Sequence, residues 1–207
     1  MERTKANLRD TMLDAAEAVI VRHGIANLTL DGVAAEAGIS KGGLLHHFPN
    51  KDHLVEALVT RTADNWRAYH QEAYERTPEG PGRMARALLS TSLSNIECWS
   101  AQCRQSSAAA FAALAQNPSL IEPMRAAHGD LRRRIAEDEL PPGVGDTIVA
   151  AIDGLWLYSV LGLVPVDQGM IVRLRKVLED MLARSKPSRS PRKAKVRAAK
   201  RAGGRCS

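Results

Sequence analysis

The chain has 207 residues, of which 44% are hydrophobic, 25% charged and only 4% aromatic. This composition is typical of a globular protein with one large or two small domains, and it favours helices over strands. The apolar run at residues 154–166 contains a proline and is shorter than the roughly 20 residues that span a bilayer. Residues 1–10 are polar and do not resemble a signal peptide. Three cysteines without close pairing fit a reducing compartment, so we expect a cytoplasmic protein with no membrane partner.

The net charge of +6 is concentrated at the C-terminal end. From Arg184 onward there are ten Lys or Arg residues and no Asp or Glu, so residues 1–183 hold 19 of the 29 basic residues against all 23 acidic ones. Overall basicity therefore does not by itself indicate a DNA-binding domain. Residues 186–207 are expected to be a basic disordered tail, because they contain almost no large apolar side chains. A solvated extension and a non-specific contact with nucleic acid both remain open as its role.

The N-terminal part predicts three helices with clear breaks. Apolar residues recur at helical spacing over residues 8–20, and Gly24 is placed to end that helix. Thr29 is a suitable N-cap for a second helix that reaches Ala37. Ser40 is a suitable N-cap for a third helix that reaches Phe48, and the short turn between them contains a glycine.

The rest of the chain also predicts helices alone, which makes the fold all-α with about nine helices. Residues 51–76 contain no proline or glycine and predict one long helix, and residues 78–82 form the clearest loop after it. Further helices are expected over residues 83–116 (two, divided near residues 99–105), 117–139, 145–164 and 167–185.

Two short helices joined by a glycine-containing turn are the pattern of a helix-turn-helix, whose second helix enters the major groove of DNA. On the expected second helix of the pair, Leu44 and Phe48 are four residues apart and point inward. The opposite side carries Lys41, Gly42, Leu45 and His46. Any short helical hairpin has similar spacing, so the pattern alone does not fix the function.

Residues 29–54 read TLDGVAAEAGISKGGLLHHFPNKDHL. This stretch resembles the signature of the tetracycline-repressor (TetR) family, with its Thr, spaced Val-Ala, Ala-Gly, Lys-Gly, His-Phe and Lys-Asp-x-Leu. The resemblance covers about residues 8–58, and the remaining body is similar to the family in helix count and layout only. Residues 152–157 are similar to a stretch in some members, including the choline-responsive repressors, but six residues do not identify a ligand.

The resemblance implies a set of residues that contact DNA. Thr29 would hold a phosphate at a helix N-terminus, where backbone N–H groups favour anions, and Lys51 would pair with another phosphate. Leu45 departs from the pattern, because the family usually has Tyr there. With two glycines beside it, few side chains can recognise bases directly, so we expect much specificity to come from DNA shape and half-site spacing. The full candidate set is Thr29, Ser40, Lys41, Gly42, Gly43, Leu45, His46, His47 and Lys51.

Other chemistry is weakly indicated. His46 and His47 could begin a metal site, but adjacent helical residues point about 100° apart and no third ligand is evident. Cys98 and Cys103 could form a redox switch, although packing as small buried residues is the simpler interpretation. No Ser-His-Asp set, paired carboxylates or phosphate-binding glycine loop occurs in a fitting context. We therefore expect no catalytic residue, no metal and no cofactor.

The resemblance also implies a ligand-binding and dimerisation body. Residues that could line a pocket for a small-molecule effector, or pack in the core instead, are Trp66, Tyr69, His70, Trp99, Phe111, Met124, His128 and Trp156. An apolar helix followed by a striped one suits a four-helix dimer interface. Its expected residues are Ile148, Ile152, Leu155, Val160, Leu174 and Leu178.

The sequence thus predicts three parts: a helix-turn-helix domain at residues 1–50, a ligand-binding and dimerisation domain at 51–185, and the tail at 186–207. The expected function is that of a homodimeric DNA-binding regulator, a repressor released from a pseudo-palindromic operator by a small-molecule effector. Activation instead of repression stays open. The alternative function is non-specific nucleic-acid binding driven by the basic tail.

Overall fold

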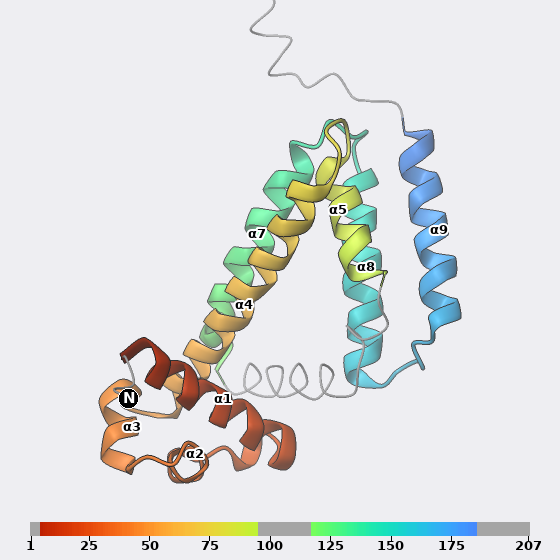
Figure 1. Ribbon diagram of the computed structural model, residues 1–207. Helices are drawn as coiled ribbons and strands as arrows, with labels where there is room; N and C mark the ends of the chain where they lie inside the picture. Colours follow the sequence, from red (N-terminus) through yellow and green to blue (C-terminus); the bar gives the residue numbers. More distant parts are fainter. Residues whose placement is uncertain (1–4, 95–116, 186–207) are drawn as a thin grey trace, which may run out of the picture.

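In the computed structural model of the chain, residues 5–94 and 117–185 are described, and every regular element among them is helical (Figure 1). The all-α prediction is confirmed. The described part holds α1 (Lys5–His23), η1 (Ile25–Asn27), α2 (Leu30–Glu36), α3 (Lys41–His47), α4 (Lys51–Arg76), α5 (Arg83–Ser92), η3 (Pro118–Ile121), α7 (Glu122–Ala136), α8 (Val144–Leu161) and α9 (Gln168–Arg184).

Several boundaries differ from the sequence prediction, and α7 and α8 end at Ala136 and Leu161, before the expected ends at residues 139 and 164. The first helix of the expected pair over residues 83–116 ends early, because α5 stops at Ser92, where Leu93 leaves the helical conformation. The second helix of that pair, with Trp99 and Phe111, lies outside the described residues, and so does the tail at 186–207. The helix expected to start at Pro118 begins as the short 3-10 helix η3 before α7 takes over.

The helices α1, α2 and α3 form a compact head at one end of the molecule (Figure 1). Helices of seven residues are marginal by themselves, so α2 and α3 depend on their caps and on packing. The Thr29 hydroxyl accepts a hydrogen bond from the backbone N–H of Gly32 at 3.1 Å, and the Ser40 hydroxyl accepts one from Gly43 at 3.1 Å. The predicted N-caps are therefore both present. Beneath them the core of the head includes Met12, Leu13, Val33, Leu44 and Phe48.

The long helix α4 belongs to two cores at once. Its first half buries Leu54, Val55 and Leu58 among the residues of the head. Its second half places Trp66 and Tyr74 against the core of the body, which α5, α7, α8 and α9 also supply. Figure 1 shows α4 running from the head into the body without a break. The expected boundaries of this helix, residues 51–76, are confirmed.

Polar contacts fix the far end of α4 and the start of α5. The Arg83 guanidinium donates to the carbonyls of Tyr74 at 3.1 Å and Thr77 at 2.8 Å, which satisfies oxygens that the end of a helix leaves free. The buried Asp138 carboxylate accepts from the backbone N–H groups of Met84 at 2.9 Å and Ala85 at 2.8 Å, so it caps α5 from the end of α7. The start of α5 is thus tied to α7.

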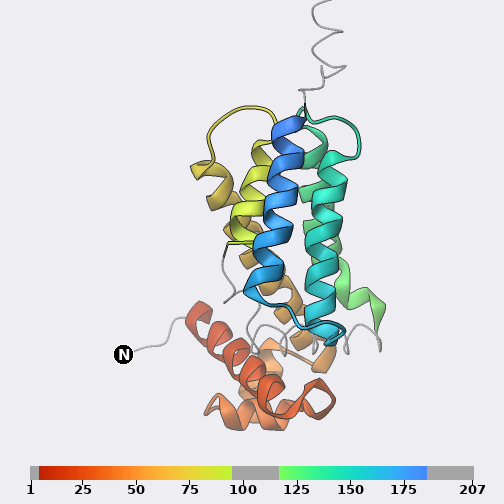
Figure 2. The same ribbon diagram turned by 90° about the vertical axis from the view of Figure 1, so that its right-hand side faces the viewer.

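The helices α8 and α9 lie side by side on the face of the body that is turned away from α4 and α7 (Figure 2). By length and composition α8 is apolar enough to cross a membrane, with a mean hydropathy of 1.4. One such helix does not overturn the expectation of no membrane partner, because the core helix of a soluble protein meets the same criterion. Six residues of α8 are buried in the single chain, among them Ile148, Ile152 and Leu155 in the core of the body.

We predict that Asp138→Ala lowers the free energy of unfolding by about 1–2 kcal/mol, because two buried N–H groups lose their acceptor. Urea unfolding followed by circular dichroism measures the change. The exposed Asp146, which pairs with Arg132 at 3.0 Å, supplies the control. Asp146→Ala should cost well under about 1 kcal/mol, and equal losses in the two variants would contradict the capping role.

Candidate functional site

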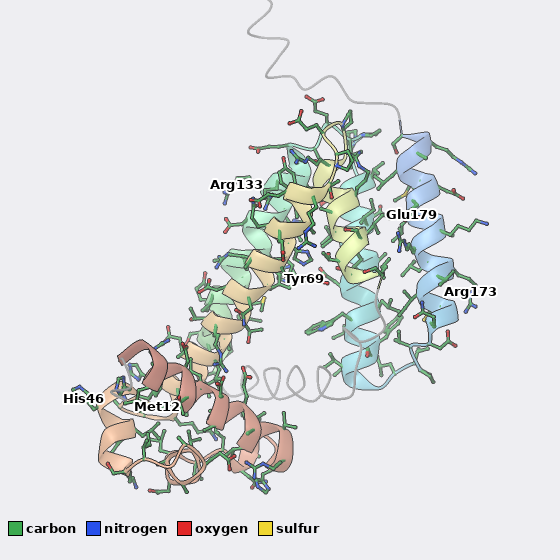
Figure 3. All side chains as sticks on the ribbon, viewed as in Figure 1. Met12, His46, Tyr69, Arg133, Arg173 and Glu179 are labelled. Atoms are coloured by element: carbon green, nitrogen blue, oxygen red, sulfur yellow. The ribbon has the colours of Figure 1, made fainter. Side chains whose placement is uncertain are left out.

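The α3 helix divides into a buried side and an exposed side as the sequence predicts. Leu44 and Phe48 are buried in the head, whereas Lys41, Gly42, Gly43 and His46 are exposed. In Figure 3, His46 projects outward from α3 while Met12 lies on the inner side of the head. The other two candidates on this helix, Leu45 and His47, are half-buried. The outer face of α3 is therefore an accessible surface with two polar side chains and little steric bulk.

Lys41 is held at the beginning of α3 by an ion pair. Its ammonium lies 2.9 Å from a carboxylate oxygen of Asp31 on α2, and both side chains are more than half exposed. Exposed pairs of this kind contribute little free energy, so an incoming phosphate can replace Asp31 at small cost. The pair keeps the ammonium near the N-terminus of α3, where the helix dipole also favours an anion.

Thr29 and Lys51 each already make one contact inside the head. The Thr29 oxygen accepts from Gly32, which leaves the hydroxyl hydrogen available as a donor. The Lys51 ammonium donates to the carbonyl of Ile25 at 3.1 Å, and an ammonium has two further N–H donors. Lys51 thus ties η1 to the start of α4 and still has donors for a phosphate.

Besides the apolar packing of α4, two further contacts hold the head against the rest of the chain, and the sequence analysis predicted neither. The Arg61 guanidinium on α4 bridges two carboxylates of α1, with nitrogen–oxygen distances of 2.7 Å to Asp14 and 2.7 Å to Glu17. Leu120 in η3 is buried in the core of the head, and Met124 packs against the same cluster. The junction therefore combines a network of ion pairs with a buried apolar contact. No local sequence signal marks either contact, because both depend on how α1 and α7 lie along α4.

Four of the predicted pocket residues come together in the body. The indole of Trp66 stacks on the His128 ring at 5.0 Å and meets the His70 ring edge-on at 4.5 Å. Tyr69 lies 5.7 Å from His70. Of the other four, Met124 packs against the core of the head and Trp156 packs against the body core on α8, whereas Trp99 and Phe111 lie outside the described residues.

His70 is the buried polar centre of this cluster. Its Nδ1 lies 3.1 Å from the hydroxyl of Thr91, and both residues are buried. Burial, with a smaller effect of the positive charges of Arg134 and His128, lowers the pKa of His70 to about 4. Beside it, His128 lies 3.9 Å from Asp153, whose own pKa is raised by burial. The centre of the body is therefore polar and disfavours additional positive charge at His70.

Two cavities open beside this cluster. The larger, of about 800 Å³, lies between α4, α5 and α9, and Tyr69 and Glu179 line its two sides (Figure 3). The smaller, of about 540 Å³, lies between α4 and α7 and is lined by Trp66 and His70. The predicted pocket residues thus reach two different cavities. Among the described residues, no three His, Cys, Asp or Glu side chains gather closely enough to hold a metal ion.

The residues expected at a dimer interface are mostly inside the chain's own core. Ile148, Ile152, Leu155 and Leu178 are buried in the single chain, and Val160 and Leu174 are half-buried. A partner cannot reach the first four, because α8 and α9 use them to pack on α5 and on each other. The apolar side chains that these helices leave exposed are Leu157, Tyr158, Leu161, Val172 and Val177.

A helix-turn-helix head on a helical body, with an open recognition surface on α3, defines a DNA-binding transcriptional regulator. Residues 12–58 match the family described as "Bacterial regulatory proteins, tetR family", and residues 82–183 match "Tetracyclin repressor-like, C-terminal domain". The chain belongs to the TetR family.

Individual relatives agree with this assignment. The regulator BetI of Burkholderia thailandensis is 28% identical over 187 residues, which cover 84% of this chain and 92% of BetI. TtgR of Pseudomonas putida is 37% identical over 62 residues, covering 28% of this chain and 30% of TtgR.

Solved structures share the fold. A transcriptional regulator of Pseudomonas aeruginosa has a TM-score of 0.67 at 22% identity, covering 83% of this chain and 88% of that one. The multidrug binding protein EbrR in complex with malachite green has a TM-score of 0.62 at 25% identity, covering 84% and 97%.

His70 makes stability depend on pH in a defined direction. A histidine with a lowered folded pKa binds fewer protons than in the unfolded chain, so its contribution is full above about pH 6.5 and is lost as pH falls towards 4. We predict that wild type loses on the order of 3 kcal/mol of unfolding free energy over this range through His70. Urea unfolding at several pH values should show a flatter profile for His70→Gln. The exposed His46→Gln should keep the wild-type slope, and an unchanged slope in His70→Gln would contradict the assignment.

Proposed function

We propose that this TetR-family chain is a homodimeric repressor that leaves a pseudo-palindromic operator when a small-molecule effector binds its body. The observation that carries the proposal is the exposed face of α3, which bears few large side chains. It belongs to a head whose core includes residues of α4, the helix that continues into the body. We assign residues 1–50 to DNA binding, 51–185 to effector binding and dimerisation, and 186–207 to a basic tail. A DNA-binding regulator acts where the chromosome is, which supports a cytoplasmic location.

On DNA, α3 would lie in the major groove. Lys41 and His46 are the side chains on its outer face that can donate to phosphates or base edges, and Leu45 can contact a thymine methyl. Gly42 and Gly43 add no side chains, so the helix backbone can approach the groove closely. Thr29 and Lys51 flank this surface and would fix its register through phosphates.

Dimerisation would pair α8 and α9 of two copies as a four-helix interface. The exposed apolar residues of these helices support this pairing, since side chains such as Leu161 and Val177 are more than half exposed in the single chain. A two-fold dimer would then place two α3 helices in successive major grooves, about 34–36 Å apart.

An effector would act by changing this spacing. The cluster of Trp66, His70 and His128 and the two cavities beside it lie along α4, which continues into the core of the head. The structural neighbour EbrR is a multidrug binding protein solved with malachite green. Effector and operator would oppose each other through a coupling free energy of about 1–3 kcal/mol.

The test is a titration of the DNA that flanks the gene of this protein against the full chain and against a chain ending at residue 185, at two salt concentrations with scrambled competitor. Tight binding to one pseudo-palindromic segment, kept by the shorter chain, is expected. The tail would add only salt-dependent, sequence-independent affinity. Sequence-blind binding that disappears with the tail would overturn the repressor proposal.

Lys51→Ala should lower operator affinity and reduce the slope of log affinity against log salt by about 0.9, because one phosphate contact is lost. Fluorescence anisotropy at several salt concentrations measures both quantities. The exposed Arg132→Ala on α7 is the control and should change neither. A lower affinity with an unchanged slope would show that Lys51 acts only through its bond to Ile25, and would contradict the phosphate role.

Leu161→Glu should convert the dimer to a monomer, since a charge would enter the proposed interface. Light scattering during size-exclusion chromatography gives the mass directly. Ala126→Glu, on the exposed side of α7, adds the same charge elsewhere and should leave the dimer intact. A dimeric Leu161→Glu variant would place the interface on another face.

A further inference from the structure

The cavity between α4 and α7 has an apolar floor and a basic rim. Met84, Ala127 and Leu131 are buried at its base, next to the indole of Trp66. Its charged lining residues are three arginines and one carboxylate, namely Arg67, Arg133, Arg134 and Asp130. A cavity of about 540 Å³ with this division between floor and rim suits a small molecule that has an apolar body and a charged end.

The charges around this cavity do not balance. Asp130 is shared between two guanidinium groups, at 3.3 Å from Arg67 and 2.6 Å from Arg133. Arg67 also reaches Asp64, at 3.1 Å, outside the cavity. No carboxylate of the described residues lies within 4 Å of the Arg134 guanidinium, which instead lies over the Tyr74 ring at 4.4 Å. Among the described residues that line it, the cavity therefore has an excess of positive charge.

Two further observations agree with an excess of positive charge. The Nε of Arg67, a residue that lines the cavity, is buried and has no hydrogen-bond partner. His70 lines the same cavity, and the charges of Arg134 and His128 add to burial in lowering its pKa. The local potential thus disfavours a cation and favours an acceptor with negative charge.

We propose that the α4–α7 cavity binds an amphipathic organic anion, an aromatic or aliphatic body that bears a carboxylate, and that this anion is the effector. The apolar body would lie over Met84, Leu131 and Trp66, and the carboxylate would accept from the arginine rim. This inference rests on the proposed function for its regulatory part. The cavity is suited to that part, because α4 enters the core of the head and η3, directly before α7, places Leu120 there.

The experiment compares two probes that share a naphthalene body and carry polar groups of opposite charge, naphthoate and naphthylmethylammonium. Calorimetric titration into the full chain should show naphthoate binding at least tenfold more tightly than the ammonium compound. Naphthoate should also weaken binding of the flanking DNA in anisotropy assays. Equal affinities, preference for the cation, or no binding of naphthoate would each overturn the proposal.

Two neighbouring arginines of α7 provide matched variants. Arg133 lines the cavity, whereas Arg132 does not and pairs with Asp146 on α8 at 3.0 Å. Arg133→Gln should lower naphthoate affinity about twofold to fivefold, since a charge-assisted hydrogen bond is lost at an exposed site. Arg132→Gln should leave the affinity unchanged, and both variants should keep the wild-type thermal midpoint within a few degrees. Equal losses of affinity in the two variants would show a general charge effect and overturn the site.

The outcomes for effector and regulator can be separated. Flanking DNA bound without any naphthoate binding would remove the anion site and leave the repressor proposal in place. Naphthoate binding that depends on Arg133 but leaves DNA affinity unchanged would overturn the effector assignment. Failure of the wild-type chain to bind flanking DNA specifically would remove the proposed function, while the binding of naphthoate alone still tests the site.

Discussion

The structure depends on one helix that completes two hydrophobic cores. The first half of α4 buries Leu54, Val55 and Leu58 in the head, and its second half packs Trp66 and Tyr74 into the body. With 26 residues and no proline or glycine, α4 is a stiff rod about 39 Å long. Both ends are fixed, since Lys51 bonds to the carbonyl of Ile25 at the head and Arg83 caps the last turn at the far end. Under the proposed function, a movement of the body would be transmitted to the head as a tilt of the whole helix, because neither core can release its share of α4 without exposing apolar surface.

Two smaller contacts restrict how far the head can move relative to the body. Arg61 holds α1 through Asp14 and Glu17, but exposed ion pairs contribute at most about 1 kcal/mol each. Leu120 is buried in the head, and burying a leucine stabilises by about 2 kcal/mol. The two links are therefore of similar strength, and the apolar contact of Leu120 comes from the segment directly before α7. A ligand between α4 and α7 would touch both helices that reach the head, so the α4–α7 cavity is well placed for regulation.

Local features of this fold could be predicted from the sequence, whereas long-range packing could not. The caps Thr29 and Ser40 and the full extent of α4 are determined within a few residues, and the structure has them where expected. The buried side of α8 could not be predicted in this way. Because α8 is apolar nearly all round, its sequence does not indicate which residues face the core of the body. Ile148 and Leu155 turned out to be internal, and Leu161 is exposed. Met124 and His128 show the same limit. They lie one turn apart on α7, yet one packs against the head and the other stacks on Trp66 in the body.

The central claim is that α4 couples DNA binding in the head to the packing of the body. Hydrogen exchange of backbone amides, measured by mass spectrometry with and without the operator segment, tests it most directly. The account predicts slower exchange on DNA binding in α3, along the second half of α4 near Trp66 and Tyr74, and in η3 around Leu120. Slower exchange confined to the head, with the second half of α4 and η3 unchanged, would show that the two cores respond independently and would contradict the account.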